Sequence, residues 1–500
     1  MNEETYHKKK IMSLTFSSGL VFIIQFMTTI ILARIFSPDE FGVISAVLII
    51  ISFAEIFVQF GIGPSIVQRK NITARDINTA FTSSIFLGIF FTIILMLFAK
   101  PLSSVINIVD SSILVVISIS FFINSFGVVS LAILQRELNF KAIILKDIFG
   151  SITYAVVAVI LGIVGFGVYS LVIAFVVKSF IGTLISIISN HYQPKIGFDK
   201  QSFMNMFLYG IGYSFSTLFN YIATQGDYFV ITRSLPTREL GIYQKSYQLV
   251  ATPSGLVGQV IDQYFLPALS KVQDNNSKIS SINLQVTTIL ALVYLPLGVL
   301  LYFVAYELVV FLLGNAWIDS VYPFQILSLF IFFRVSYKIT DSIFLAKGAV
   351  YIRTFAKILY ATNIVVFSLI GVKYGISGVA YGVGFALVIN YLIMIILSYS
   401  LIKYNIIEYL HWIFVLFLCC ILSFILISEI MGIIFVDVNI GIFVLLISKS
   451  VLILACLAFV YTIVIYLFAP KKMKHFLYTI IYKVFIFIKT QFIKLIGRGK

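Results

Sequence analysis

Long apolar runs alternate with short polar segments along most of the chain. Runs such as 43–67, 79–99, 283–313 and 441–469 are each at least about as long as the ~20 residues with which a helix crosses a bilayer. This pattern predicts an all-α polytopic membrane protein. We expect about 14 transmembrane helices, near 12–35, 41–66, 79–99, 111–133, 148–164, 167–189, 203–232, 240–268, 284–313, 321–345, 354–372, 376–402, 409–433 and 441–469.

Composition supports this class. Of the 500 residues, 60% are hydrophobic and 11% are charged, whereas soluble domains carry roughly 25% charged residues. The net charge of +15 comes from Lys and Arg in the segments between apolar runs, which is typical of membrane topology and not of nucleic-acid binding. Cys419, Cys420 and Cys456 lie in apolar runs, so no disulfide or metal site is expected.

The basic residues also predict an orientation. With the amino terminus in the cytoplasm, the predicted inside segments hold about 20 Lys and Arg and the outside segments about 4. The first apolar run is longer than the core of a cleaved signal peptide and is expected to be retained as a helix. We therefore expect a multi-pass protein of the cell (plasma or inner) membrane, with both termini in the cytoplasm.

A polar corner occurs twice. "ILARIFSPDEFGVISA" (31–46) aligns with "VITRSLPTRELGIYQKS" (230–246) at an offset of 199, which places Glu40 on Glu239 and Arg34 on Arg233. Because six spans precede the second copy, the copies are expected to be parallel repeats. We predict two six-helix lobes around a central cavity. The boundaries are 1–190 for the first lobe, 191–202 for a cytoplasmic linker, 203–403 for the second lobe, 404–470 for two further helices and 471–500 for a basic amphipathic tail.

Charged side chains inside apolar spans usually face a cavity or a partner. Arg334, Lys338 and Asp341 follow i, i+4, i+7 spacing and are predicted to share one helix face. Lys245 and Asp227 flank the second corner at similar depth, and a structural ion pair is the alternative to a functional role. Glu55 and Asp262 are lone acids in apolar runs. Lys178 and Lys449 are expected to snorkel to the interface.

Helix 12–35 and helix 203–232 carry many hydroxyls, amides and tyrosines, among them Gln25 and Asn220. These polar groups predict that both helices line the cavity, although hydrogen bonding between helices is an alternative explanation. Arg34 and Arg233 lie one turn inside the predicted outer rim. Arg34 either snorkels to head groups or contacts a substrate at its release.

Several segments resemble the polysaccharide transporters of the multidrug/oligosaccharidyl-lipid/polysaccharide exporter superfamily, and the Wzx-type flippases in particular. They are "LARIFSPDEFGVISAVLIIISFAEIFVQFGIGPSIVQR" (32–69), "LQRELNFKAI" (134–143), "GFGVYSLV" (165–172), "DYFVITRSLPTRELGIYQKSYQL" (227–249) and "LPALSKVQ" (266–273). The resemblance implies a protein that flips undecaprenyl-diphosphate-linked oligosaccharides to the outer leaflet for cell-surface polysaccharide synthesis. The expected partners are this lipid-linked oligosaccharide, membrane lipids and other polysaccharide-assembly membrane proteins.

With this substrate, cations are expected to compensate the diphosphate. The predicted substrate-binding residues are Arg334, Lys338, Lys245, Arg34, Arg233, Asn220 and Gln25. The candidates for H+ or Na+ coupling are Asp227, Asp262, Glu55 and Asp341, and no cofactor is expected. A multidrug cation antiporter of the same superfamily is the alternative, because acids are also present. An enzyme is not expected, since no paired carboxylates, nucleotide-binding loop or histidine cluster appears.

Overall fold

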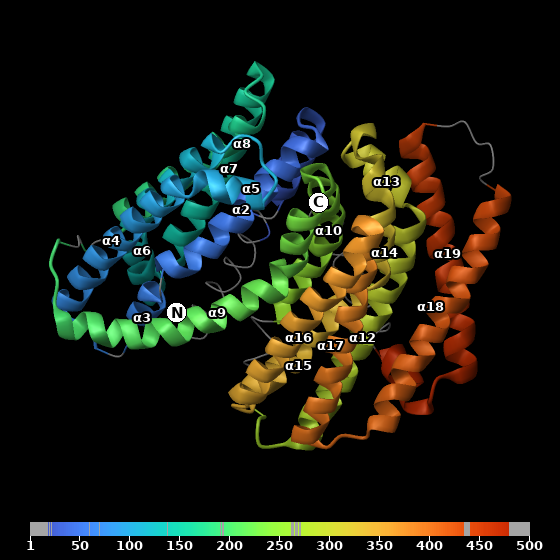
Figure 1. The fold of residues 1–500 in the computed structure, drawn as a ribbon. Helices are drawn as coiled ribbons and strands as arrows, with labels where there is room; N and C mark the ends of the chain where they lie inside the picture. Colours follow the sequence, from blue (N-terminus) through green and yellow to red (C-terminus); the bar gives the residue numbers. More distant parts are fainter. Residues whose placement is uncertain are drawn as a thin grey trace, which may run out of the picture. The chain divides into compact units, whose positions relative to one another are not determined.

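The computed structural model describes residues 19, 21, 23–59, 61–69, 71–137, 139–190, 192, 195–261, 265, 269, 272–434 and 441–479, and these residues form helices without any strand (Figure 1). An apolar helix covers Ile23–Ile35. The labelled α-helices are α2 (Pro38–Gln59), α3 (Ile62–Gln68), α4 (Ala74–Leu97), α5 (Ala99–Val105), α6 (Ser112–Arg136), α7 (Phe140–Val164), α8 (Val168–Ile188), α9 (Lys200–Ser234), α10 (Thr237–Val260), α12 (Asn276–Phe303), α13 (Ala305–Leu312), α14 (Val321–Leu329), α15 (Ile331–Ala346), α16 (Val350–Gly371), α17 (Gly375–Ile402), α18 (Ile406–Ile434) and α19 (Ile442–Phe468). Short 3₁₀ helices are η2 (Asn315–Ser320) and η3 (Val372–Tyr374).

Helix occupies most of each predicted span in the part of the chain that the structure describes. Within the described ranges, nine helical segments are long and apolar enough to cross a membrane, or ten if one bent pair counts as a span. The predicted class, an all-helical polytopic membrane protein, is confirmed. The count of 14 spans and the two-lobe layout stay predictions.

Three predicted spans are broken rather than continuous, so their predicted continuity was wrong. Span 41–66 divides at Gly61, whose φ of 64° is left-handed and whose Cβ, if present, would lie 2.7 Å from the Cα of Gly210. Glycine is therefore needed there for both conformation and close approach. Span 284–313 divides at Val304, and span 321–345 bends by 44° at Phe330.

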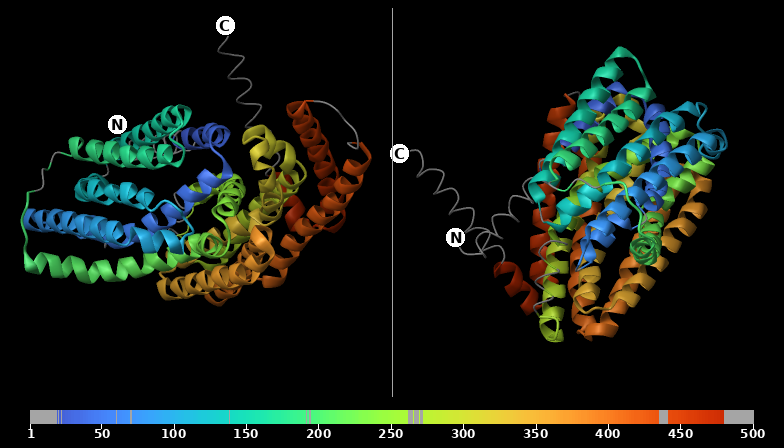
Figure 2. Two further views of the ribbon diagram at one scale, coloured as in Figure 1. Left: turned by 45° about the horizontal axis from the view of Figure 1, so that its top comes forward. Right: turned by 90° about the vertical axis from the view of Figure 1, so that its left-hand side faces the viewer.

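The chain forms two compact units. Unit 1 contains Met1–Leu256, Val309–Leu327 and Tyr351–Asn390, and unit 2 contains Val257–Leu308, Ser328–Val350 and Tyr391–Lys500. Within unit 1, α4, α6, α7 and α8 pack as one bundle and α9 runs along α4 (Figure 2). Within unit 2, α18 and α19 lie side by side. The predicted lobe boundaries stay predictions.

Aromatic side chains fill the core of unit 2. Phe332 and Phe333 of α15 pack against Tyr391 of α17 with ring centroids 5.5 Å apart, and both also contact Phe417 of α18. These contacts bury the apolar face of α15, whereas Arg334, Lys338 and Asp341 lie on another face and are only partly buried. The core thus sets the direction in which the cations of α15 point.

Candidate transport site

A polar cavity of about 500 Å3 lies within unit 1, among the helix Ile23–Ile35, α2, α6, α7 and α8. Its polar and charged lining residues are Gln25, Glu55, Gln59, Asn124, Lys146, Asp147, Ser151, Lys178, Ser179, Thr183 and Ser186. A carboxylate, ammonium groups, amides and hydroxyls therefore converge inside an otherwise apolar bundle. Such a set can bind hydroxyl groups and anions of a polar ligand.

Glu55 of α2 lies at the centre of this polar set. Asn124 of α6 donates a hydrogen bond to Glu55 Oε1 at 3.5 Å, and Lys178 of α8 lines the same cavity. The Lys178 ammonium also lies 5.7 Å from the ring centroid of Tyr154, within the range of a cation–π contact. The sequence predicts that Lys178 snorkels to the interface, whereas the structure places it in the same cavity as Glu55.

A local sequence signal explains how two lysines reach this cavity. Lys146 and Gly150 on α7, and Lys178 and Gly182 on α8, each follow the pattern Lys-x-x-x-Gly. A Cβ at Gly150 would lie 3.5 Å from Cγ of Lys178, and a Cβ at Gly182 would lie 3.6 Å from Cγ of Lys146. Each lysine stem therefore crosses the facing helix at a glycine. This repeated pattern could have identified both residues from the sequence.

A second cavity of about 230 Å3 adjoins the first, because Glu55 and Gln59 line both. Helix α9 contributes Tyr213, Thr217, Asn220, Tyr221 and Thr224 to it. The Tyr221 hydroxyl donates to the carbonyl of Ile49 at 2.5 Å, which ties α9 to α2. Gln25 and Asn220 thus line neighbouring cavities that share Glu55.

The two polar corners of the sequence repeat meet in the structure. We call this contact the seam: Asp39, Gly42 and Ser45 of α2 against Arg238, Gly241 and Gln244 of α10. A carboxylate oxygen of Asp39 lies 3.9 Å from Nε of Arg238, and the Ser45 hydroxyl is hydrogen-bonded to Oε1 of Gln244. The partners in each pair are 199 residues apart, which is the offset of the repeat.

The glycines at the middle of the seam leave no room for a side chain. A Cβ at Gly42 would lie 1.8 Å from the carbonyl oxygen of Thr237, and a Cβ at Gly241 would lie 2.1 Å from that of Pro38. Pro38 and Thr237 are also 199 residues apart, so the contact is reciprocal, as in an interface with two-fold symmetry. Backbone of α2 therefore lies directly against backbone of α10.

Residues 310–320 pack around the same end of α2 and α10. Arg34 donates hydrogen bonds to the carbonyls of Val310, Phe311 and Leu312, at the end of α13. Trp317 is fully buried and donates from Nε1 to the Ala33 carbonyl at 2.8 Å. A cation at a helix carboxyl terminus satisfies carbonyls that lack helical partners. The structure thus places Arg34 as a cap for α13.

Lys245 and Asp227 are both buried, but they do not form the ion pair considered above. Lys245 is 3% exposed, and its ammonium lies 3.6 Å from the ring centroid of Phe41 and 3.5 Å from Oε1 of Gln248. In the described part of the chain, no carboxylate lies within 4 Å of this ammonium. Asp227 instead accepts a hydrogen bond from Tyr243 at 2.8 Å. The Lys245 ammonium is thus held by an aromatic ring and an amide.

In unit 2, Arg334, Lys338 and Asp341 lie on one half-exposed face of α15, between fully buried apolar turns. This is the face predicted from their spacing. A Cβ at Gly258 would lie 2.2 Å from the ammonium of Lys338, so the Lys338 side chain lies over the backbone of Gly258. The structure therefore places these three charges together on one face of α15.

The remaining charged candidates are dispersed. Arg233 is exposed in the last turn of α9, and Asp262 lies outside the described residues. Lys449 of α19, which sequence reasoning assigned to snorkelling, forms a 2.5 Å ion pair with Glu307, whose side chain is 2% exposed. This pair connects α19 to α13 within unit 2.

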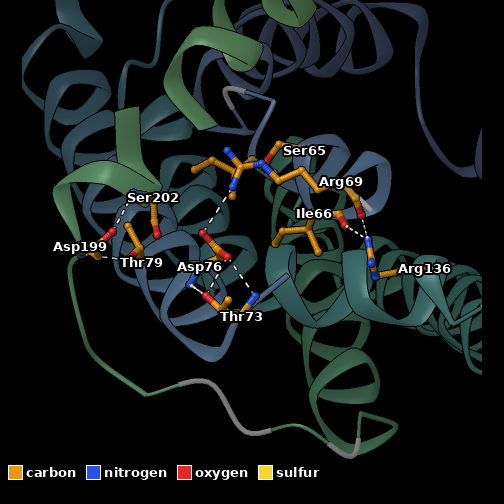
Figure 3. Close-up of polar contacts among 10 residues, drawn as sticks. Ser65, Ile66, Arg69, Thr73, Asp76, Thr79, Arg136, Asp199 and Ser202 are labelled. Atoms are coloured by element: carbon orange, nitrogen blue, oxygen red, sulfur yellow. Dashed lines mark hydrogen bonds and ion pairs between the residues drawn. The ribbon is translucent and has the colours of Figure 1, made fainter. Parts of the chain in front are cut away.

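Ordered polar contacts also surround the end of unit 1 at which α3, α4 and α9 meet (Figure 3). Arg136 donates to the carbonyl of Ile66 at 2.8 Å and to that of Arg69, and Arg69 pairs with Asp76 at 3.3 Å. Thr73 and Asp76 form a capping box at the start of α4. This end carries predicted cytoplasmic segments.

An all-helical polytopic chain with charged cavities inside its bundle belongs to the class of membrane proteins that handle polar solutes. Residues 31–322 match the family described as polysaccharide biosynthesis protein, and the chain belongs to this family. The resemblance to polysaccharide transporters seen in the sequence is thereby confirmed.

The chain is also similar in sequence to individual proteins. A Klebsiella pneumoniae protein described as an uncharacterized membrane protein in the cps region is 25% identical over 380 residues, covering 73% of this chain and 76% of that protein. The succinoglycan biosynthesis transport protein ExoT of Rhizobium meliloti (strain 1021) is 24% identical over 300 residues, covering 59% of this chain and 60% of ExoT. The match to ExoT thus spans less than two thirds of either chain.

Among solved structures, the lipid II flippase MurJ in its inward closed conformation has a similar fold. The TM-score is 0.72 at 15% identity, over 91% of this chain and 98% of MurJ. At this identity the likeness concerns the fold alone.

Proposed function

We propose that this protein flips an undecaprenyl-diphosphate-linked oligosaccharide from the cytoplasmic to the outer leaflet by alternating access, for the synthesis of a cell-surface polysaccharide. The observation that carries the proposal is the pair of adjoining polar cavities in unit 1, in a chain of the polysaccharide biosynthesis family. Oligosaccharides offer hydroxyls and apolar ring faces, which match the amides, hydroxyls and tyrosines of the lining. The relatives' names, a succinoglycan transport protein among them, support this substrate class.

In this proposal, different residues bind the sugar and the diphosphate parts of the substrate. Gln25, Asn220 and their neighbours bind the sugars, and cations compensate the diphosphate. The candidate cations are Lys178 in the cavity and the buried Lys245 in unit 1, and Arg334 and Lys338 on α15 in unit 2. Arg34 and Arg233 lie near the predicted outer end, where the diphosphate leaves. At Arg34, the departing diphosphate then competes with the carbonyls of α13 for the guanidinium.

The seam supplies the gate. It holds α2 against α10 at the predicted outer end, so a substrate in the cavities reaches the outer leaflet only when the seam opens. We further propose 14 spans in two six-helix lobes, both termini in the cytoplasm, and a location in the inner or plasma membrane. Proton or sodium coupling is assigned to Glu55, Asp227, Asp262 or Asp341, and other polysaccharide-assembly membrane proteins are the proposed partners.

A deletion strain tests the proposal. We expect it to accumulate lipid-linked repeat units on the cytoplasmic leaflet and to lose surface polysaccharide, and the wild-type protein to reverse both. Lys178→Met, and Arg334→Ala combined with Lys338→Ala, should insert normally yet fail to clear the pool. The matched control is Lys373→Met, which removes an exposed lysine of η3 far from the cavity lining in sequence and should restore transport fully.

The outcomes separate the hypotheses. Full rescue by the Arg334→Ala, Lys338→Ala variant would show that α15 is not part of the substrate site. Full rescue by Lys178→Met would show that the polar cavity is not the substrate site. An unchanged pool of lipid-linked units in the deletion strain would refute the flippase itself. If that strain instead lost resistance to lipophilic cations, the multidrug antiporter would be the correct function.

A further inference from the structure

An apolar groove of about 470 Å3 lies on unit 1, separate from the polar cavities. Its walls come from α3, α4, α9 and the segment before α9, and its lining is Ile62, Thr82, Ser83, Phe86, Leu87, Phe198, Phe203, Met206 and Phe207. None of these residues lines either polar cavity. Phe86 is 67% exposed and Phe198 is 63% exposed, so the described chain leaves much of the groove's aromatic surface uncovered.

Specific hydrogen bonds build one wall of the groove. The segment 195–199, which we call the strap, is fastened to α4. The Lys195 backbone N–H donates to Oδ1 of Asn78 at 2.9 Å, and Gly197 exchanges two bonds with the Thr82 hydroxyl. The Asp199 N–H donates to Thr79 Oγ1 (Figure 3). The strap thereby holds Phe198 over the groove.

Aromatic rings continue from the strap along α9. The ring centroids of Phe198 and Phe203 are 5.4 Å apart, and those of Phe203 and Phe207 are 5.7 Å apart. The rings thus form a row that follows α9 away from its first turn. An extended apolar chain lying along α9 would contact the entire row.

Cations gather at the strap end of the groove. Arg75 shares a face of α4 with Thr79, Thr82 and Phe86, and Lys200 shares a face of α9 with Phe203 and Phe207, by their helical spacing. Lys195 lies in the strap. All three are exposed, and among the described residues none has a carboxylate within 4 Å. Arg69 and Arg136, by contrast, are already bonded to Asp76 and to backbone carbonyls (Figure 3).

The acids nearby do not cancel these charges. Hydrogen bonds from Ser202, aided by the charge of Arg75, lower the pKa of the Asp199 carboxyl, which caps α9. Asp76 is held by Thr73 and Arg69. Asp76, Asp199 and Glu137, the exposed residue after Arg136, therefore oppose five cations at this end, and a net positive charge remains beside the groove. The five cations are the three exposed ones together with Arg69 and Arg136.

We propose that this groove binds an anionic phospholipid of the bilayer, with one acyl chain along the phenylalanine row and the phosphate at Arg75, Lys195 and Lys200. The groove takes a hydrocarbon chain and the cations take an anionic head group, at the end predicted to face the cytoplasmic leaflet. The lining has almost no polar groups for an oligosaccharide, which favours a phospholipid over the transported substrate. The site is independent of the proposed transport function.

Purified protein in a neutral detergent, titrated with phosphatidylglycerol or phosphatidylcholine and followed by intact-complex mass spectrometry and thermal unfolding, tests the proposal. We expect phosphatidylglycerol to bind preferentially and to raise the melting temperature. The variant Arg75→Gln, Lys195→Gln, Lys200→Gln should lose at least about tenfold in affinity, because each basic residue near an anionic head group contributes roughly fivefold. Exchanging Arg75 for Lys and both lysines for Arg should retain binding.

The matched control neutralises three other predicted cytoplasmic cations, Lys471, Lys472 and Lys474, and should bind like the wild type. Equal binding of both phospholipids, or wild-type affinity in the Arg75 triple variant, would overturn the proposal. If glycerol phosphate competed as well as phosphatidylglycerol, the groove would have no role. If undecaprenyl diphosphate alone bound, the occupant would be the substrate and the phospholipid assignment would be wrong.

Discussion

Adding one methyl group at the seam should shift the protein toward a state in which α2 and α10 are separated. In the structure, a Cβ at Gly42 would lie 1.8 Å from the Thr237 carbonyl oxygen and 2.5 Å from its carbon. Both atoms belong to backbone, which cannot rotate away as a side chain can. We therefore expect Gly42→Ala, and likewise Gly241→Ala, to disfavour the closed seam.

The magnitude follows from the geometry. Real Cβ atoms essentially never approach closer than 3.0 Å, so the Thr237 carbonyl must move by about 1.2 Å. Overpacking of a well-packed contact costs about 1–3 kcal/mol. At 1.4 kcal/mol per factor of ten, the population of the closed state relative to the open one should fall roughly 5- to 150-fold. For Gly241→Ala the corresponding distance is 2.1 Å, so its effect should be similar.

Labelling of a cysteine inside the seam measures this shift. Ser45 is 2% exposed, so Ser45→Cys should react slowly with a membrane-impermeant maleimide while the seam is closed. The native Cys419, Cys420 and Cys456 are first replaced by alanine. In this background, Gly42→Ala should raise the labelling rate at position 45 by at least about fivefold, since the reagent reads the population of the open state.

Gly255→Ala is the matched control, because Gly255 lies on the same helix α10 as Gly241 and a Cβ there meets nothing within 4 Å. It gains the same helix propensity, about 0.5–1 kcal/mol, without the clash. If Gly42→Ala and Gly241→Ala labelled no faster than Gly255→Ala, backbone contact would not control the seam, and the gate argument would fail.

Three further predictions concern other sites. Lys245→Met should keep the expression level and melting temperature, because Met preserves the packing on Phe41, but should slow clearance of lipid-linked units; unchanged clearance would exclude Lys245 from the site. Glu307→Gln or Lys449→Met should each lower the free energy of unfolding by about 3–5 kcal/mol, since each single change leaves the other partner of a buried pair behind. In thermal or denaturant unfolding, the double variant should lose less than the two single losses combined. Additive losses would contradict a coupled pair. Asp199→Ala should lower the stability measured by thermal unfolding at pH 7 through loss of the α9 cap, and Asp199→Asn much less. Because the pKa of Asp199 is lowered on folding, the gap between wild type and Asp199→Ala should persist above about pH 4 and close as pH falls below it; a gap that closed near neutral pH would contradict this.

The apolar pattern predicted the helices because each span must satisfy its own backbone inside lipid. It failed at Val304 and Phe330, where helices break without a proline or glycine to mark the change. Gly61 did offer a signal, but a glycine inside an apolar run is equally consistent with close packing of a continuous helix. Its requirement comes from Gly210, which is distant in sequence.

The candidate site was predictable only in part, for similar reasons. Gln25 and Asn220 stand out in the sequence because the first and seventh predicted helices carry many polar groups. Glu55 stands out because it is an isolated acid in an apolar run, and such groups are costly in lipid. Lys178 was missed because a lysine stem can carry its charge to the interface, and only the glycine on the facing helix shows that it does not. The repeat offset of 199 related Gly42 to Gly241, yet it could not show that equivalent residues contact each other. That contact depends on how close both lie to the local symmetry axis.

The composition of the seam suits a contact that must open repeatedly. Its centre is backbone against backbone at Gly42 and Gly241, where separation breaks van der Waals contacts. One turn further along α10, separation also takes the buried Lys245 ammonium off the Phe41 ring of α2. Its ion pairs lie at the rim: Arg238 is 45% exposed, and its partners Asp39 and Asp319 are 63% and 55% exposed. Exposed pairs contribute only about 0–1 kcal/mol each, so water replaces them at little cost when the helices part. The buried pair of Glu307 and Lys449, by contrast, would leave charges uncompensated if broken, and it lies within unit 2, away from this contact in the chain. The buried ion pair thus joins helices inside one unit, while the proposed gate relies on close backbone packing at its centre and on exposed ion pairs at its rim.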